Sequence, residues 1–450
     1  MKTKVIFFLS LLFGCSSYAQ SGKTDSKLFL VTFESNDIGD VRFYLELSLK
    51  EGKVIGGSLQ NAYAQTFDGA DRTKIKLFAG IKNKRLVYVE GYYKEENGAL
   101  NFHTAFFSPI RNYYFNGTIQ NNTIEGELAT PDSSTKARLW GKAYEKESPE
   151  PVTDYQQLSA SFCSSFEASF FDPAFLKTSK YQNLKENLTG YSSKAQDDLH
   201  YVFSVYYYTR SLPYSHIGIW RKEKDKKEIK EEDELSYTKK GNTGVLTIRS
   251  FTTEPGEMAR QMDQLLNDDI QNLVIDLRNN PGGNIGPAIE LGQSLVNKPT
   301  SGGYFLSRKY YEAGNNAQPD ACTVFSQGNM EQFVAALGEN KCVEVKITPG
   351  AHTFKKPIYI LTNEGTASTC EPIVYALKQE PHITIAGQHT AGKMLSAKEV
   401  PLADGFVLFV PDADYVTTAR ERLDQKGVEP EVSLKQSEDA LEYALQHIGR

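Results

Sequence analysis

The run LVIDLRNNPGG, residues 273–283, decides the fold class of the C-terminal half of this 450-residue chain. It begins as a short apolar stretch, which is typical of a buried strand, and ends in an Asn-Asn-Pro-Gly-Gly turn. Helical apolar spacing follows at residues 288–296. A buried strand, a glycine-rich turn and a helix in succession indicate an α/β layer fold with parallel strands.

The same alternation of strands and helices continues on both sides of this run. We expect strands at 245–249, 358–362, 383–386 and 406–410, and helices at 257–266, 373–378 and 438–448. These elements define an α/β core over residues 241–450. Within it, we expect residues 309–350 to form an irregular surface insertion.

The first third of the chain has a different pattern. Residues 27–145 contain apolar/polar alternation interrupted by turn signals such as Asn97-Gly98 and Asn121-Asn122. We expect a separate all-β domain, an antiparallel barrel or sandwich, whose Tyr and Phe residues are core and surface aromatics rather than the lining of a ligand pocket. A polar linker, 145–151, separates it from a segment with helical spacing at 152–222.

Composition excludes several classes of protein. Hydrophobic residues make up 40% and charged residues 24% of the chain, which are globular values. Fifty Lys+Arg against 56 Asp+Glu give a net charge of -6, so binding to nucleic acid or to an anionic membrane has no bulk electrostatic support. Five cysteines are too few for a disulfide-scaffold protein.

The N-terminus predicts export. Lys2 and Lys4 precede a short apolar core at 5–13, and Ser17-Tyr-Ala19 fits a cleavage site, so residues 1–20 form a predicted signal peptide. The run LFGC ending at Cys15 also resembles a bacterial lipobox, with a signal of residues 1–14 and a lipid anchor at Cys15. Both alternatives stay open. We expect an exported protein, periplasmic, secreted or tethered by lipid, for example to an outer membrane, without a membrane span.

The remaining cysteines fit this compartment. Cys322 and Cys342 lie in one loop-rich segment, where pairing is one of two expectations, since export implies oxidising conditions. Cys163 and Cys370 are expected to be buried small hydrophobes. No pair of Cys or His residues has ligand-like spacing, so we expect no metal site.

A second strand-to-turn run carries a candidate nucleophile. In IYILTNEGTASTCE, residues 358–371, a buried strand leads to a small-residue turn, and Pro372 suits the first turn of a helix. Ser368 would therefore lie at a strand-to-helix elbow beside unpaired backbone N–H groups. Taken alone, a serine in this position is more often a helix cap, and the glycines of 273–283 are more often a plain turn.

Together with GQHTAGK (387–393) and PYSHIG (213–218), these runs resemble the C-terminal processing, or tail-specific, serine peptidases and the related tricorn-core peptidases. The resemblance covers about residues 155–450 and includes the late run GVEPE, 427–431. It implies a crotonase/protease-type layered ββα core, peptide-bond hydrolysis and no metal or organic cofactor. The roughly 20 residues between Trp220 and Gly241 are too few for the PDZ domain that many relatives insert there.

The resemblance also implies roles. Ser368 corresponds to the nucleophile, and the backbone N–H groups of Gly282 or Gly283 and of Thr369 correspond to the oxyanion hole. The serine–lysine branch of the family places its base at Lys393. The tricorn-like branch places its base at His216, preceded by Ser215.

The sequence thus carries two candidate bases. Histidine titrates near neutrality, whereas lysine needs desolvation, and Ala397 stands where the serine–lysine branch often has a supporting Gln. His216 is therefore the favoured base. For the carboxylate of the tricorn-like branch, the sequence offers only Glu421 and Glu429 nearby.

The leading functional hypothesis is an exported serine peptidase acting on unstructured peptides or protein C-termini. The main alternative is a catalytically inactive peptide- or ligand-binding protein on the same fold. A crotonase-like acyl-thioester enzyme is disfavoured by the Thr-Ala-Ser elbow. The N-terminal β domain is hypothesised to recognise or dock substrates in place of a PDZ domain.

Overall fold

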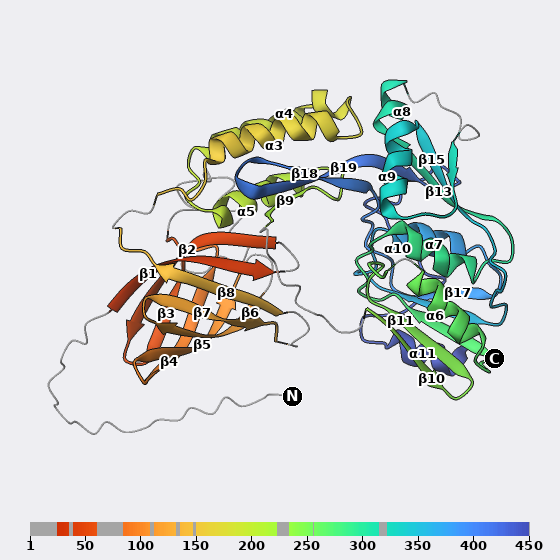
Figure 1. Cartoon of the computed structure of the whole chain (residues 1–450), viewed down its shortest axis with the longest axis horizontal. Coiled ribbons are helices and arrows are strands. Elements are labelled where there is room, and N and C mark those ends of the chain that lie inside the picture. The colour runs from red at the N-terminus through yellow and green to blue at the C-terminus, as the bar shows by residue number, and fades with distance from the viewer. Residues whose placement is uncertain are drawn as a thin grey trace, which may run out of the picture. The chain divides into compact units, whose positions relative to one another are not determined.

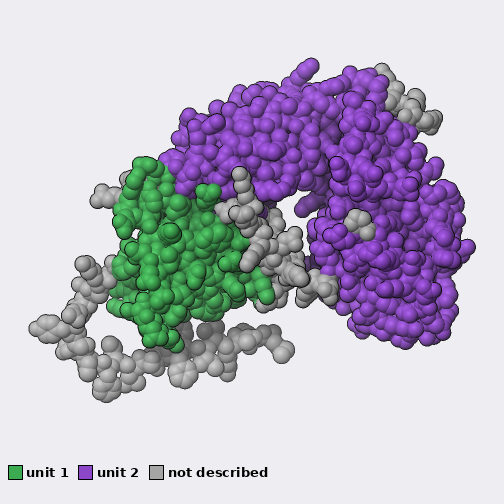
Figure 2. Space-filling model, in the orientation of Figure 1, with its two compact units in different colours: residues 1–37, 42–150 green, residues 38–41, 151–450 purple. Residues whose placement is uncertain are grey.

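The computed structural model describes residues 25–35, 39–60, 84–108, 112–131, 136–146, 150–222, 234–254, 256–314 and 322–449. The predicted signal peptide with Cys15 and most of the charged run at 221–234 lie outside the described residues. The chain divides into two compact units, residues 1–37 with 42–150 and residues 38–41 with 151–450 (Figure 2).

The first unit is built of antiparallel strands joined mostly in chain order (Figure 1). The strands are β1 (Asp25–Ser35), β2 (Gly39–Lys50), β3 (Lys53–Ser58), β4 (Tyr88–Glu96), β5 (Ala99–Phe107), β6 (Asn112–Gln120), β7 (Thr123–Ala129) and β8 (Lys136–Ala143). β1 pairs with both β8 and β2, so the described strands close into a barrel. Of the two expected all-β architectures, the barrel is the one formed.

The barrel interior is filled by side chains. Phe29, Val31, Phe106 and Leu128 are all buried, as strict alternation along the strands requires. Gly126 faces the ring of Phe115: a β-carbon at this glycine would lie 2.7 Å from the ring edge. The predicted reading of these aromatics as core rather than pocket lining is therefore consistent with their burial.

The second unit begins with helices, as the spacing at 152–222 predicts. They are α3 (Tyr155–Ser169), η1 (Phe175–Lys177), α4 (Ser179–Ser192) and α5 (Asp198–Thr209). Asp154 starts α3 by accepting hydrogen bonds from the backbone N–H groups of Gln156 and Gln157.

The core of this unit contains a largely parallel sheet of order β10-β11-β12-β16-β17-β20, in which only β10 is antiparallel to its neighbour. Its strands are β10 (Leu235–Lys240), β11 (Thr243–Ile248), β12 (Asn272–Asp276), β16 (Ile358–Thr362), β17 (Ile383–Gly387) and β20 (Val432–Ser433). The associated helices are α6 (Glu257–Leu266), α7 (Ile285–Gln293), α10 (Cys370–Leu377) and α11 (Ala440–His447). The predicted α/β layer fold is thus present.

A second set of strands lies beside these helices. It has the order β9-β19-β13-β15-β14, with β18 also paired to β19. The elements are β9 (Gly218–Arg221), β13 (Thr300–Ser307), α8 (Arg308–Glu312), β14 (Thr323–Phe325), α9 (Met330–Glu339), β15 (Cys342–Ile347), β18 (Ser396–Pro401), η3 (Ala403–Gly405) and β19 (Phe406–Val416).

The expectation of an irregular insertion at 309–350 was wrong. The described part of that segment contains α9 and β15, and β15 lies between β13 and β14. Val343, Val345 and Ile347 of β15 are fully buried. β15 pairs antiparallel with β13, which lies far from it in the chain, so no short turn joins the two strands. The sequence therefore lacks the turn residues that would predict a hairpin there.

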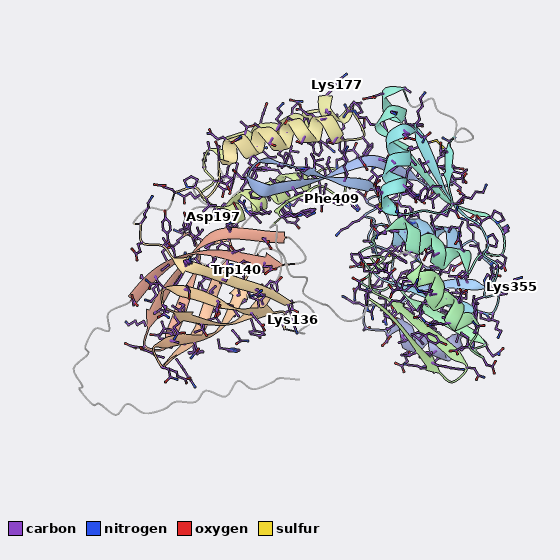
Figure 3. All side chains as sticks on the ribbon, in the orientation of Figure 1. Lys136, Trp140, Lys177, Asp197, Lys355 and Phe409 are labelled. Carbon is purple, nitrogen blue, oxygen red and sulfur yellow. A yellow bond between two sulfur atoms is a disulfide. The ribbon has the colours of Figure 1, made fainter. Side chains whose placement is uncertain are left out.

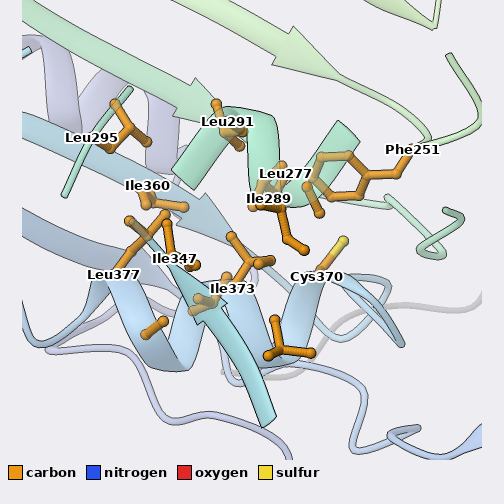
Figure 4. Close-up of a cluster of buried hydrophobic side chains, with 14 of the residues drawn as sticks. Phe251, Leu277, Ile289, Leu291, Leu295, Ile347, Ile360, Cys370, Ile373 and Leu377 are labelled. Carbon is orange, nitrogen blue, oxygen red and sulfur yellow. The ribbon is translucent and has the colours of Figure 1, made fainter. Parts of the chain in front are cut away.

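Alternation along the parallel strands produces the layers. In β12, Leu273 and Ile275 face α6, α7 and α10, whereas Val274 faces α11. Figure 4 shows the first of these clusters, where Ile373 of α10 and Ile289 of α7 pack near Ile347 of β15. Since each fully buried apolar side chain of this size contributes roughly 1.5–3 kcal/mol, this cluster holds β12 and β16 rigidly under the turns that follow them.

The cysteines follow their sequence expectations. Cys322 and Cys342 form a disulfide, so the pairing expectation is confirmed. Cys163 and Cys370 are buried and free. Burial raises the pKa of the Cys163 thiol to about 11 and raises that of Cys370 as well. Among the described residues, no helix has the length and apolarity needed to cross a bilayer.

Candidate active site

The elbow between β16 and α10 holds Ser368 in a left-handed conformation, with φ of 54°. Its backbone N–H donates to the carbonyl oxygen of Lys393 at 3.1 Å and to Glu371 Oε2 at 3.2 Å. Left-handed backbone is costly for a residue with a β-carbon and persists where surrounding contacts over-determine it. The side chain of Ser368 remains partly exposed, so its hydroxyl is accessible.

The loop between β12 and α7 lies against this elbow. A β-carbon on Gly282 would be 2.7 Å from the β-carbon of Ser368, so only glycine permits this approach. The hydroxyl of Thr369 donates to the carbonyl oxygen of Gly283 at 2.7 Å and joins the two segments. The structure thus brings together Gly282, Gly283, Ser368 and Thr369, as the sequence predicts.

The backbone donors of this loop differ in availability. The N–H of Gly282 donates to Asn280 Oδ1 at 2.9 Å. In the described part of the chain, the N–H groups of Gly283 and Thr369 donate no hydrogen bond to another group. Two free amides beside a serine hydroxyl form a pair of donors of the kind that stabilises an oxyanion.

His216 lies across from the serine. Its Nε2 is 3.4 Å from Ser368 Oγ, and its Nδ1 is 2.6 Å from Ser215 Oγ. The imidazole ring packs 5.5 Å from the ring of Phe409, a β19 residue labelled in Figure 3. His216 also has a left-handed backbone, with φ of 60°. Desolvation, assisted by the charge of Lys393, lowers the pKa of His216 to about 4.

Asp424 was missed by sequence reasoning. Its Oδ2 accepts the backbone N–H of Ser215 at 3.2 Å, and its Oδ1 accepts that of Met394 at 3.1 Å. The side chain is fully buried, with Arg422 Nη2 at 3.6 Å from Oδ2. Asp424 therefore supports the segment that carries Ser215 and His216.

The two carboxylates considered from the sequence, Glu421 and Glu429, are exposed instead. Neither contacts Ser215 or His216 within the residues described. No local sequence signal points to Asp424, because its burial and its hydrogen bond to Ser215 both depend on contacts between distant parts of the chain.

Lys393 approaches the elbow mainly through its backbone. Its carbonyl accepts the N–H of Ser368, and its own N–H donates to Glu371 Oε2 at 2.9 Å. The side chain is exposed. The ammonium group is close enough to act on the pKa of His216, so both predicted bases lie in one region.

Glu371 closes the run 358–371 that carries the resemblance, but its role was not predicted from the sequence. Its buried carboxylate accepts the hydroxyl of Thr390 at 2.6 Å and the N–H groups of Gly392, Lys393 and Ser368 at 2.8, 2.9 and 3.2 Å. Burial raises its pKa to about 7, although these hydrogen bonds act in the opposite direction. Glu371 ties residues 390–393 to the elbow.

The arrangement fits nucleophilic chemistry. A hydroxyl, a neutral imidazole and two free amides meet at one place, which is the set of groups that acyl transfer needs. Among the described residues, no group of three or more His, Cys, Asp or Glu side chains is placed to hold a metal ion.

Comparison with known proteins shows which family this part of the chain resembles. Residues 242–434 match the model of peptidase family S41. The chloroplastic carboxyl-terminal-processing peptidase 3 of Arabidopsis thaliana is 25% identical over 191 residues, 42% of this chain and 31% of that protein. The carboxy-terminal processing protease CtpB of Bacillus subtilis (strain 168) is 24% identical over 196 residues, 43% of this chain and 34% of that protein.

The chain thus spans about a third of the length of these relatives. A solved lipoprotein structure from Streptococcus agalactiae is 16% identical and superposes over 67% of this chain and 99% of that one, with a TM-score of 0.45. The family match contains both strand-to-turn runs, Ser368 and Lys393, and His216 precedes it. Residues 242–434 are therefore similar to peptidase family S41.

Proposed function

We propose that this protein is a serine peptidase in which Ser368 is the nucleophile and His216 the general base. The observation that carries the proposal is the 3.4 Å separation of His216 Nε2 from Ser368 Oγ, with His216 Nδ1 bound to Ser215 Oγ on the opposite side. A base within reach of the hydroxyl, itself oriented by a third group, is the general signature of an activated nucleophile. The S41 domain supports the same reaction class.

Acylation follows from this geometry. His216 Nε2 accepts the hydroxyl proton as Ser368 Oγ bonds to the carbonyl carbon of the scissile peptide. The proton then passes from Nε2 to the leaving amine as the C–N bond breaks, which leaves an acyl ester on Ser368. Water, deprotonated by the same nitrogen, hydrolyses the ester and restores the hydroxyl.

The charges that develop have partners. The imidazolium formed in each step is oriented by Ser215, whose backbone is held by the buried carboxylate of Asp424. The oxyanion is assigned to the free N–H groups of Gly283 and Thr369, because the N–H of Gly282 is already bound to Asn280. A lowered pKa keeps His216 neutral, and so able to accept a proton, throughout the physiological range.

Lys393 is assigned a different role from that in the serine–lysine branch. A lysine base must be desolvated to lose its proton near neutrality, whereas this side chain is exposed. Its charge instead helps to keep His216 deprotonated.

The substrates proposed are unstructured peptides or protein C-termini. The relatives in Arabidopsis thaliana and Bacillus subtilis are named for processing carboxyl termini. An unstructured substrate can also adopt the extended form needed to pass beside the elbow that carries Ser368. We further propose an exported protein, on the grounds of the signal-like residues 1–20, with lipidation at Cys15 as the alternative form of export.

The test is Ser368→Ala in the full chain. Removing the nucleophile lowers kcat/KM towards denatured casein or a quenched peptide by about 10⁴-fold or more and abolishes labelling by a fluorophosphonate probe. Circular dichroism and unfolding midpoint serve as controls for folding. Retained hydrolysis in this variant contradicts the proposal, and an unreactive wild-type protein that binds peptides supports the inactive binding protein instead.

A further inference from the structure

We propose that Asn280 is the positioning residue of the oxyanion hole: its buried amide sets which backbone N–H groups remain free beside Ser368. The inference rests on the proposed function and deepens it. Asn280 does not reach the reacting atoms. It acts through Gly282 and through the residue preceding the nucleophile.

The side chain of Asn280 uses both ends of its amide. Its Nδ2 donates to the carbonyl oxygen of Ile248, the last residue of β11, at 3.0 Å. Its Oδ1 accepts the N–H of Gly282 at 2.9 Å. The residue is completely buried, so neither bond competes with solvent. The position requires one hydrogen-bond donor and one acceptor. A carboxylate or an apolar side chain of similar size cannot supply both.

The backbone of Asn280 holds the elbow. Its carbonyl oxygen accepts the N–H of Ala367 at 2.9 Å. Ala367 directly precedes Ser368, so one residue fixes the glycine loop through its side chain and the nucleophile turn through its main chain. Pro281 follows, which restricts the backbone of Asn280 to extended conformations and adds no competing N–H.

The bond to Asn280 decides which amide is left for the substrate. With the N–H of Gly282 directed into the loop, the N–H of Gly283 is the next donor along the chain, and it has no acceptor within the described residues. Thr369 reinforces this by binding the carbonyl oxygen of Gly283 through its hydroxyl. Asn280 thus preorganises Gly283 for an oxyanion, and preorganised donors cost no rearrangement during the reaction.

The neighbouring residue supplies a matched control. Asn279 lies in the same loop but is exposed, and its side chain accepts a hydrogen bond from Asn363 Nδ2 at 2.9 Å. An Asn→Asp change preserves that acceptor at position 279. At position 280 it removes the donor to Ile248 and sets a carboxylate oxygen against a carbonyl oxygen.

The experiment compares Asn280→Asp and Asn280→Ala with Asn279→Asp in the full chain. We expect the Asn280 variants to lose roughly 10²-fold in kcat with little change in KM, while Asn279→Asp stays within about twofold of wild type. A peptidyl aldehyde forms an oxyanion-bearing adduct with Ser368, so its affinity should fall by the same factor as kcat. The affinity of the corresponding product peptide, which forms no adduct, should not change.

Unchanged kcat in the Asn280 variants overturns the inference, and so does an equal loss of affinity for aldehyde and product, which indicates general disorder. A measurement on the wild type applies even if the variants do not fold. Labelling with carbonyl-¹³C and ¹⁵N glycine selects the amide of the second glycine in Gly-Gly pairs, including Gly283. Its resonance should shift on formation of the aldehyde adduct, and an unmoved Gly283 signal contradicts the assignment.

The same data separate this inference from the proposed function. Hydrolysis that survives Ser368→Ala defeats both. Hydrolysis that depends on Ser368 but not on Asn280 defeats only the role of Asn280.

Discussion

Both units contain non-glycine residues with left-handed backbone, and the two sets differ in their surroundings. In the barrel unit, such residues lie in exposed turns, with φ between 49° and 60°: Glu51, Lys84, Asn97, Asn121 and Asn122. In the second unit, His216 and Ser368 have similar φ values but lie among polar groups contributed by distant segments.

The difference shows that left-handed backbone can be stabilised in two ways, by a local turn or by contacts with distant segments. Exposed turns supply left-handed backbone through local structure, and asparagine tolerates it there at little cost, so the barrel residues need no distant contacts. Histidine and serine gain no such local support and hold a conformation that costs of order 1–3 kcal/mol. Exposed left-handed loop residues such as Asp404 and Arg420 also occur in the second unit, so it is the combination of strain with polar contacts that marks the site.

The largest effect that bears on this comparison is expected at His216. His216→Asn should lower kcat/KM by about 10³-fold, because the strained residue is assigned the proton transfer.

Lys393→Met should retain most activity. Loss of its positive charge raises the pKa of His216, so the acid limb of kcat/KM should move to higher pH.

The control for the charge effect is Lys355→Met, which removes an exposed lysine of the same unit, labelled in Figure 3. Its acid limb should coincide with that of wild type. An inactive Lys393→Met at every pH, together with an active His216→Asn, reverses the assignment of the base.

A smaller effect is expected at Glu371, the buried partner of the Ser368 N–H. A raised pKa means that the folded state binds its proton more tightly than the unfolded state, so the contribution of Glu371 to stability is full below about pH 4.5 and declines as pH rises towards 7. The difference amounts to about 3 kcal/mol by linkage. Against Glu371→Gln, the wild type should therefore lose relative stability across that window.

His216 acts in the opposite direction, since its lowered pKa adds stability as pH rises from about 4 to 6.5. In the wild type, these two opposite changes in the free energy of unfolding with pH partly cancel. In Glu371→Gln, only the increase in stability due to His216 should remain. Urea unfolding between pH 4 and 8 measures both, with the exposed Glu364→Gln as control. A wild-type-to-variant difference that does not change with pH contradicts the account.

The smallest effect is expected in the stability of Gly and Ala variants, compared at the strained Ser368 and at the turn residue Asn122. Glycine adopts left-handed backbone freely, so Ser368→Gly should be more stable to urea than Ser368→Ala by about 1 kcal/mol. Asn122→Gly should exceed Asn122→Ala by a similar amount. If the pair at 368 shows no difference while the pair at 122 does, Ser368 is not strained and the comparison between the two units fails.

Sequence reasoning reached the elements that carry local signals. The helix at 257–266 and the strand at 358–362 were predicted with the observed bounds, because apolar periodicity and turn residues define them. Barrel and sandwich were not distinguishable, since closure depends on the pairing of β1 with β8, about a hundred residues apart. β15 was missed for the same reason.

The residues of the site also fall into those that the sequence indicated and those that it did not. Ser368, Gly283 and Thr369 lie in turns next to buried strands, but those turns alone indicate only a helix cap and a plain turn. Their roles were predicted from the resemblance to the peptidase family. Asp424 depends on a contact with Ser215, 209 positions away in the chain, and on a side chain one methylene shorter than the glutamate sought. Contacts of that range leave no periodicity or spacing to read.

The burial of the sulfur atoms has a practical consequence. Among the described cysteines, Cys322 and Cys342 are bonded to each other, and Cys163 and Cys370 are enclosed with their thiols held protonated. Iodoacetamide therefore finds little to react with in the folded protein over that part of the chain. Ser368→Cys would place one solvent-accessible thiol at the elbow, and its alkylation rate as a function of pH would report directly on the ionisation of the groups around it.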